Sequence, residues 1–170
     1  MHILVTGGAG FIGSNFVHLL RRERPDWRIS VLDKLTYAGN PRNLEQIKDD
    51  ITFIKGDVAE VDDVRQAMEG CDAVINFAAE THVDRSIVDA DAFIRTDVYG
   101  AYVLLEAAKA LKIERFVQVS TDEVYGEVPE GFSVETDPLM PRNPYAASKA
   151  GADRLAYSYW ATHGVPVIIS

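Results

Sequence analysis

The chain has 170 residues, of which 47% are hydrophobic and 25% are charged, and its formal net charge at pH 7 is −9. This length suits one domain with a sizeable core, and the acidic balance argues against binding to nucleic acids or to anionic membranes. No apolar run approaches the roughly 20 residues that a membrane span needs. The single Cys71 permits no internal disulfide and is expected to be a packed thiol rather than a nucleophile, which favours a reducing, cytoplasmic location.

Strand and helix patterns alternate along the whole chain. Apolar runs predict six strands, over residues 2–6, 28–32, 51–55, 73–77, 115–120 and 165–170. Amphipathic patterns predict helices over residues 11–22, 44–48, 61–69, 91–111 and 143–163. Helical crossovers between strands predict one α/β domain over residues 1–170, a Rossmann-type doubly wound parallel sheet with strand order 3-2-1-4-5-6 and helices on both faces.

A glycine-rich turn follows the first predicted strand. The segment from Thr6 to Gly13 reads TGGAGFIG and leads directly into an amphipathic helix. In such a turn one glycine makes the tight bend, a second lets a pyrophosphate approach the backbone, and a third lets helix and strand pack closely. The free N–H groups of the helix then face the phosphates. The motif alone could be a turn without a ligand, but the flanking strand and helix favour dinucleotide binding.

Polar and small residues also end the next strands. Asp33 follows the last glycine of the turn by twenty residues and could accept hydrogen bonds from ribose hydroxyls, while its charge would repel a 2′-phosphate. It therefore favours NAD over NADP, although Lys34 beside it weakens that exclusion and Asp33 could instead cap a turn. Asp57 could contact the adenine or cap the next helix. Ala78 and Ala79 leave room for a cofactor to cross the sheet.

Tyr145 and Lys149 lie four residues apart in the last predicted helix, so they share one face. A tyrosine with its usual pKa of about 10 is a poor base at neutral pH. A nearby ammonium and a cationic nicotinamide would favour the phenolate and lower that pKa. The pair could then take a proton from a substrate alcohol while hydride leaves its carbon. Thr121 could share that proton or be a polar strand terminus, and Tyr145 with Lys149 could be only an exposed helix pair.

Five segments carry a resemblance to a known family: TGGAGFIGSNFV at 6–17, LDKLTYAGN at 32–40, HVDRSI at 82–87, STDEVYG at 120–126 and NPYAASKA at 143–150. With these segments the whole chain resembles the N-terminal half of extended short-chain dehydrogenases/reductases that act on nucleotide sugars. The first and last segments belong to the wider superfamily. LTYAGN and the Thr-Asp-Glu of STDEVYG point to its 4,6-dehydratases, which implies dTDP-glucose as the substrate and NAD as the cofactor.

The resemblance implies a role for each residue of Thr121-Asp122-Glu123. Tyr145, with Thr121 as its partner, would remove the proton of the sugar 4-hydroxyl while hydride passes from C4 to NAD. Glu123 would remove the C5 proton, Asp122 would protonate the departing 6-hydroxyl, and the hydride would return to C6, so that NAD stays bound. Adjacent carboxylates in one cleft tend to have separated pKa values, which suits an acid and a base. Without the resemblance, both could be ordinary loop acids.

The resemblance also implies binding residues and a partner. The residues implied to contact NAD are Gly7, Gly10, Phe11, Ile12, Gly13, Asp33, Lys34, Thr36, Asp57, Val58, Ala78, Ala79, Tyr145 and Lys149. His82 and Ser86 become candidates near the sugar and the diphosphate, although His82 could equally be a structural loop histidine. The helices at 91–111 and 143–163 would pair with their copies in a homodimer. The first of them is apolar nearly all round, which independently favours burial on more than one side.

Two departures from the family pattern are present. Asp97 stands where relatives usually carry Asn, which would change a local hydrogen bond. The family continues for about as many residues again, so the chain is expected to be a fragment that lacks a C-terminal substrate-binding domain. Two other functions stay open: a nucleotide-sugar 4-epimerase, which needs no carboxylates at 122 and 123, and a non-catalytic cofactor-binding or interaction module. No metal site is predicted.

Overall fold

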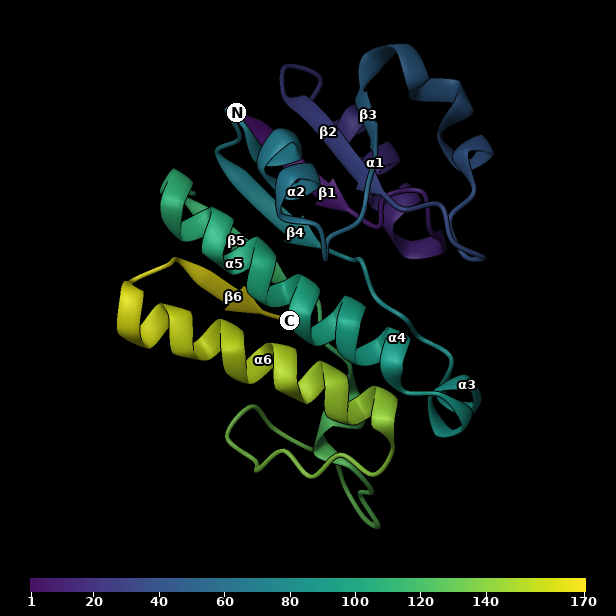
Figure 1. Ribbon diagram of the computed structural model, residues 1–170, viewed down its shortest axis with the longest axis vertical. Coiled ribbons are helices and arrows are strands. Elements are labelled where there is room, and N and C mark those ends of the chain that lie inside the picture. The colour runs from purple at the N-terminus through teal and green to yellow at the C-terminus, as the bar shows by residue number, and fades with distance from the viewer.

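A computed structural model describes residues 1–170 as a six-stranded sheet with the order β3-β2-β1-β4-β5-β6 (Figure 1). The strands are β1 His2–Thr6, β2 Arg28–Asp33, β3 Thr52–Lys55, β4 Ala73–Asn76, β5 Arg115–Gln118 and β6 Val167–Ile169. Every neighbouring pair is parallel. The direction of strand succession reverses between β1 and β4, so the predicted Rossmann-type doubly wound sheet is confirmed.

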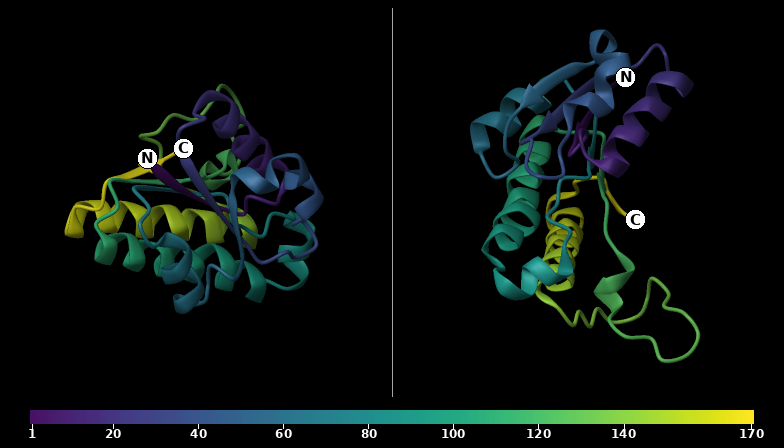
Figure 2. Two further views of the ribbon diagram at one scale, coloured as in Figure 1. Left: turned by 90° about the horizontal axis from the view of Figure 1, so that it is seen from above. Right: turned by 90° about the vertical axis from the view of Figure 1, so that its right-hand side faces the viewer.

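Helices form a layer on each face of the sheet (Figure 2). They are α1 Phe11–Glu23, η1 Pro41–Asp50, α2 Val61–Met68, α3 Val83–Val88, α4 Asp91–Phe93, η2 Ile94–Tyr99, α5 Gly100–Leu111, η3 Asp122–Tyr125 and α6 Pro144–His163. Of these, η1 and η3 are 3₁₀ helices and η2 is a π-helix. α1 and η1 pack on one face, while α2, α5 and α6 pack on the other. None of the helices has the length and hydropathy that crossing a membrane requires.

Successive side chains of each strand point to opposite faces of the sheet and pack against the two helix layers. In β1, Leu4 packs with Leu104 of α5, whereas Val5 on the opposite face packs with Val17 of α1. Because both faces are covered, the central strands read as continuous apolar runs. Burying each such side chain contributes roughly 1.5–3 kcal/mol. The result is a rigid sheet whose carboxyl ends can position a site.

The helix predicted over residues 91–111 is continuous but not regular. Its second turn, η2, is π-helical and lies between the short α4 and the regular α5. At the start of α5, a Cβ atom on Gly100 would lie 2.7 Å from Cγ2 of Val58, so only glycine lets the helix approach the loop after β3 so closely. π-helical turns carry an extra residue and are frequent at functional sites.

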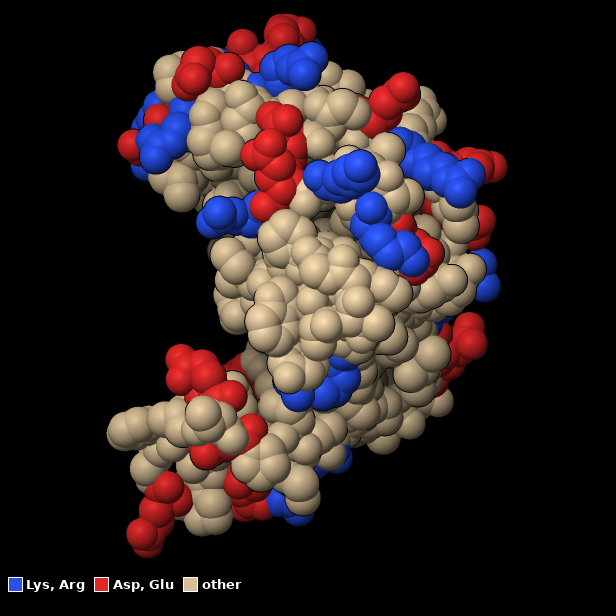
Figure 3. Space-filling model, turned by 90° about the vertical axis from the view of Figure 1, so that its left-hand side faces the viewer, with Lys and Arg blue, Asp and Glu red and all other residues tan.

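Other differences from the predictions are local. The short helix predicted at 44–48 is the longer 3₁₀ segment η1, and two short helices, α3 and η3, form where no helix was predicted. Residues 126–142 then extend away from the sheet before α6 begins (Figures 1 and 2). This segment carries Glu127, Glu130, Glu135 and Asp137. Figure 3 shows acidic atoms gathered there, and a hollow in the surface between the segment and the main body.

Candidate functional site

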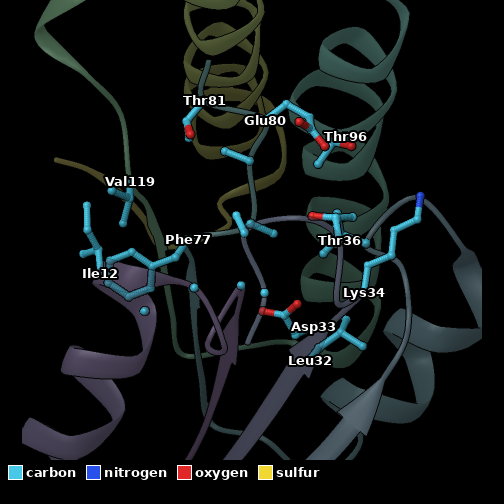
Figure 4. Close-up of a pocket in the computed structure, with 18 of the residues that line it drawn as sticks. Ile12, Leu32, Asp33, Lys34, Thr36, Phe77, Glu80, Thr81, Thr96 and Val119 are labelled. Carbon is cyan, nitrogen blue, oxygen red and sulfur yellow. The ribbon is translucent and has the colours of Figure 1, made fainter. Parts of the chain in front are cut away.

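A cavity of about 450 Å³ lies where β1 to β5 end (Figure 4). It is bounded by the segments that follow these strands and by residues of α6. Ligands of doubly wound sheets bind at such carboxyl ends, near the point where strand order reverses. The lining includes every residue predicted above to contact NAD, from Gly7 to Lys149. The predicted residues therefore meet in one place, while their individual contacts stay predictions.

The glycine turn forms a cradle in which side chains have no room. Gly7 has φ +66°, and a Cβ atom there would lie 2.7 Å from the backbone nitrogen of Ala78. A Cβ atom on Gly13 would collide with the carbonyl oxygen of Gly7 and lie 2.9 Å from Cα of Gly8. The N-cap of α1 is Gly10, and no side chain caps this helix end. Its first N–H groups are thus available to an anion, as a bound phosphate would require.

Asp33 braces the turn that it follows. Its Oδ2 accepts a hydrogen bond from the Ala9 N–H at 2.9 Å, and its Oδ1 accepts one from the Leu35 N–H at 2.8 Å. Leu35 adopts the left-handed conformation, with φ 59°. Each carboxylate oxygen still has lone-pair capacity for another donor. Capping a turn and accepting ribose hydroxyls, considered above as alternatives, are therefore compatible.

Lys34 is directed away from Asp33. Its ammonium lies 2.6 Å from Oδ2 of Asp57, and Figure 4 shows its side chain extended away from the Asp33 carboxylate. Oδ1 of Asp57 accepts the Ala59 N–H at 2.9 Å, so Asp57 also caps its own turn. The ion pair joins the segments after β2 and β3 across one end of the cavity.

Tyr145 lies buried in the first turn of α6. Burial raises the pKa of Tyr145 above its ordinary value, a hydrogen bond from Thr121 lowers it, and the charge of Glu123 raises it again. The net direction is upward, opposite to the lowering expected from Lys149. Thr121 therefore lies close enough to Tyr145 to act on its pKa, while the Thr121 hydroxyl donates to Oδ1 of Asp122 at 3.4 Å.

Lys149 does not direct its ammonium to the Tyr145 hydroxyl. Instead, its Nζ donates to the carbonyl oxygen of Val119 at 2.6 Å. Burial lowers the pKa of Lys149, while the negative charges of Asp97 and Asp153 raise it. Asp153 accepts a hydrogen bond from the Ser120 hydroxyl through Oδ2, and its Oδ1 has no hydrogen-bond partner. The cation is thus compensated by two buried acids.

Asp122 and Glu123 lie on η3, outside the lining of the cavity. The Thr121 hydroxyl caps this short helix by accepting the Glu123 N–H at 3.4 Å. Oε2 of Glu123 accepts a hydrogen bond from Nδ2 of Asn143 at 2.8 Å, and the other amide atom of Asn143 caps the first turn of α6. Asn143 therefore ties Glu123 to the helix that carries Tyr145, whereas Asp122 is exposed.

His82 and Ser86 do not line the cavity either. Ser86 is buried, and its hydroxyl donates to the carbonyl oxygen of Val83 at 2.6 Å within α3. His82 is exposed, with its ring centroid 5.4 Å from that of Tyr37. Their roles near the sugar and the diphosphate stay predictions.

Several lining residues had no predicted role: Leu32, Ala38, Gly39, Gly56, Phe77, Glu80, Thr81, Thr96, Val119 and Ser120. Glu80 and Thr81 directly follow the alanines at the end of β4, so the strand-end rule that singled out those alanines would also have found them. Thr96 lies inside a helical pattern and gave no such signal.

Asp97 connects the segment after β4 to α6. Its Oδ1 accepts the Glu80 N–H at 2.8 Å, and its Oδ2 lies 2.7 Å from the Ser148 hydroxyl. Burial raises the pKa of Asp97 to about 6, while the hydrogen bonds from Ser148 and Glu80 oppose the rise. The residue that departs from the family pattern therefore occupies a fully bonded position beside Lys149.

Known proteins are similar to this chain in sequence and in fold. A dTDP-glucose 4,6-dehydratase from Streptomyces niveus is 51% identical over 176 aligned residues, covering 100% of this chain and 52% of the relative. The crystal structure of DesIV, a dTDP-glucose 4,6-dehydratase from Streptomyces venezuelae crystallised with NAD, matches with a TM-score of 0.95 at 47% identity, over 99% of this chain and 54% of that one. A UDP-glucose 4-epimerase from Thermus thermophilus, in complex with NAD, matches with a TM-score of 0.91 at 34% identity, over the same two shares.

The chain spans about half the length of the curated relatives that it matches. The family model described as GDP-mannose 4,6 dehydratase covers residues 4–170 and so takes in the glycine turn, the cavity and helix α6. The chain therefore belongs to the GDP-mannose 4,6 dehydratase family.

Proposed function

We propose that this chain is the cofactor-binding half of a dTDP-glucose 4,6-dehydratase, which converts dTDP-glucose to dTDP-4-keto-6-deoxyglucose and water. The observation that carries the proposal is that Thr121, Asp122 and Glu123 lie beside Tyr145 at the start of α6. Thr121 lies close enough to Tyr145 to lower its pKa, Asn143 ties Glu123 to the same helix, and Asp122 and Glu123 would supply an acid and a base. The identity of 51% to a dehydratase, against 34% to an epimerase, supports the same choice.

We propose NAD as the cofactor. The turn around Gly7 and Gly13, where a side chain would not fit, suits a pyrophosphate. Asp33 would accept ribose hydroxyls, and Tyr145 with Lys149 would border the nicotinamide. When bound, NAD supplies a hydride acceptor that can later return the hydride. Asp33, by its charge, disfavours the 2′-phosphate of NADP.

In this proposal Tyr145 takes the proton from the sugar 4-hydroxyl. Burial and the acids around it raise the pKa of Tyr145, so this residue needs help to act as a base. Donation of a hydrogen bond from the nearby Thr121 hydroxyl would supply part of that help by stabilising the phenolate. Thr121 would also orient the substrate hydroxyl, because its oxygen can accept while its proton is donated.

Glu123 and Asp122 would carry out the elimination of water that follows oxidation at C4. Glu123 would take the C5 proton, which the neighbouring ketone acidifies, and the Asn143 amide directs its carboxylate. Asp122 would give a proton to the departing 6-hydroxyl so that water leaves. Its only close partner is the Thr121 hydroxyl, at 3.4 Å, so its carboxyl group is free to turn toward a substrate.

Incubation of the purified protein with dTDP-glucose and NAD tests the proposal. The 4-keto-6-deoxy product should appear as an absorbance that develops in alkali, and Tyr145→Phe should abolish it. The double variant Asp122→Asn, Glu123→Gln should also abolish it, whereas an epimerase would keep its turnover. Formation of a 4-epimer alone would favour the epimerase, and NAD binding without any turnover would favour a non-catalytic module.

We also propose a cytoplasmic homodimer that forms through residues 91–111 and 143–163. Exposed aromatic pairs lie on these helices: Tyr99 with Tyr102, ring centroids 5.7 Å apart, and Tyr157 with Trp160, 5.6 Å apart. Aromatic residues in an apolar patch are typical of interfaces. Sedimentation should give a dimer for the native protein and a monomer for Trp160→Glu. The single buried thiol, Cys71, suits a reducing compartment.

A further inference from the structure

Tyr37 is half exposed, and its ring contacts two side chains of another segment. Its ring lies under the Arg85 guanidinium, 4.2 Å from ring centroid to Cζ, and beside the ring of His82. Burial raises the pKa of Tyr37, the nearby carboxylate of Glu80 adds to the rise, and the side chain of Thr81 opposes it, so both side chains lie near the Tyr37 hydroxyl. All four partners belong to the segment that follows β4, whereas Tyr37 belongs to the loop that follows β2.

These two segments form two walls of the cavity. Thr36 and Gly39 line it from the loop after β2, and Glu80 and Thr81 line it from the segment after β4. Figure 4 shows Thr36 with Glu80 and Thr81 above it. Tyr37 itself is absent from the lining, so its side chain joins the walls from outside.

The wall that Tyr37 contacts is itself fixed. Glu80 is buried, and its N–H donates to Asp97, which in turn is bonded to Ser148 of α6. The loop after β2 has fewer anchors, chiefly the Leu35 N–H to Asp33 bond and backbone bonds around Gly39 and Asn40. Contacts of Tyr37 therefore restrain the more weakly anchored wall against the firmer one.

We propose that Tyr37 is a positioning residue that ties the two walls of the cavity together and thereby slows the release of bound NAD. This inference rests on the proposed function. A cofactor that must take up and return a hydride within one turnover has to stay bound between the two transfers. Side-chain contacts that must break before the walls separate would supply that retention.

The contacts differ in strength, which gives graded variants. A cation–π contact of this geometry changes an equilibrium by roughly three- to tenfold. Tyr37→Phe removes the hydroxyl near Glu80 and Thr81 and keeps the ring, whereas Tyr37→Ala removes both. Arg85→Ala removes only the cation. Arg24→Ala is the matched control, since Arg24 lies 5.7 Å over the Trp27 ring and neither residue lines the cavity.

The release of NADH from the purified protein, followed by its fluorescence after a chase with excess NAD, measures the effect directly. We expect release about tenfold faster for Tyr37→Ala, about threefold faster for Tyr37→Phe and Arg85→Ala, and unchanged for Arg24→Ala. The melting temperature without cofactor should be the same for all variants within a few degrees.

Two results would separate this inference from the proposed function. A native protein that binds neither NADH nor NAD would overturn the proposed function. A native protein that binds both, with release from Tyr37→Ala at the native rate, would overturn the role of Tyr37 and leave the proposed function intact. A lower melting temperature for Tyr37→Ala at an unchanged release rate would likewise reduce Tyr37 to loop stabilisation.

Discussion

The hydroxyl oxygen of Ser148 lies 2.7 Å from Oδ2 of Asp97 and 2.7 Å from the carbonyl oxygen of Tyr145. A serine hydroxyl carries one proton and can donate to only one of two acceptors. Below a pH of about 6 a proton on Asp97 resolves the conflict, because the acid then donates to Ser148 and Ser148 donates to the carbonyl. Burial, which raises the pKa of Asp97 to about 6, acts in the same direction.

This arrangement predicts a pH-dependent stability that Asp97→Asn removes. Because the folded-state pKa of Asp97 is about 6 rather than 3.8, the native state holds the extra proton between those values. Its stabilising effect is complete below about pH 4 and is lost as pH rises through 6, by about 3 kcal/mol. An asparagine can donate to Ser148 and accept from Glu80 without titrating. Urea unfolding should show Asp97→Asn to be more stable at pH 7 but not at pH 4; a pH-independent difference would contradict the prediction.

Asn143 allows the cap of α6 to be separated from the support of Glu123. In Asn143→Asp the carboxylate still caps the helix, but the amide donor to Glu123 is replaced by a like charge. We expect stability within about 0.5 kcal/mol of the native protein and turnover reduced by about ten- to a hundredfold.

Asn143→Ala is the comparison for this prediction, since it loses both functions. It should lose similar turnover and also about 1 kcal/mol of stability. NAD affinity should be unchanged in both variants. Full turnover by Asn143→Asp, measured by formation of the 4-keto product, would exclude a role of the amide in directing Glu123.

Gly13→Ala should abolish cofactor binding, because the added Cβ atom would meet backbone atoms of Gly7 and Gly8 that cannot move aside. Gly151→Ala is the matched control. Its Cβ atom would lie 3.4 Å from Cγ2 of Val98, an ordinary contact, and alanine in a helix interior is more stable than glycine by up to about 1 kcal/mol. Calorimetry with NAD should find native affinity for Gly151→Ala only. Equal affinity for both variants would refute the proposal that the glycine turn binds the cofactor.

The Lys34–Asp57 ion pair predicts a change of cofactor preference. Asp57→Asn retains an acceptor for the Ala59 N–H but releases the Lys34 ammonium, which can then attract a 2′-phosphate. NADP affinity should rise by about threefold relative to NAD, a modest factor because Lys34 is half exposed. The double variant Lys34→Met, Asp57→Asn should lose the gain. The single variant Lys34→Met completes the comparison. If the effects of Lys34→Met and Asp57→Asn on the ratio of NADP to NAD affinity simply add in the double variant, the ion pair does not control cofactor preference.

The sheet and the cavity followed from local patterns in the sequence. Strand ends marked by Gly7, Asp33 and Ala78 converge in any doubly wound sheet, so the strand-end rule was enough to place them together. The relations between side chains were not accessible in this way. The upward pKa direction of Tyr145 depends on burial and on acids from two elements, η2 and η3. The contact between Tyr37 and Arg85 depends on a loop and on the short helix α3, neither of which periodicity describes.

The π-helical turn η2 determines the direction in which the side chains before α5 point around the helix axis. An α-helix advances about 100° and 1.5 Å per residue, so deletion of one residue here would restore a regular helix and turn the residues before the deletion by about that angle relative to α5. Thr96 would then leave the cavity and Asp97 its bonds to Glu80 and Ser148, while the apolar packing of α5 stayed as it is. One helix therefore packs on the sheet with one half and borders the cavity with the other because a single extra residue lies between them.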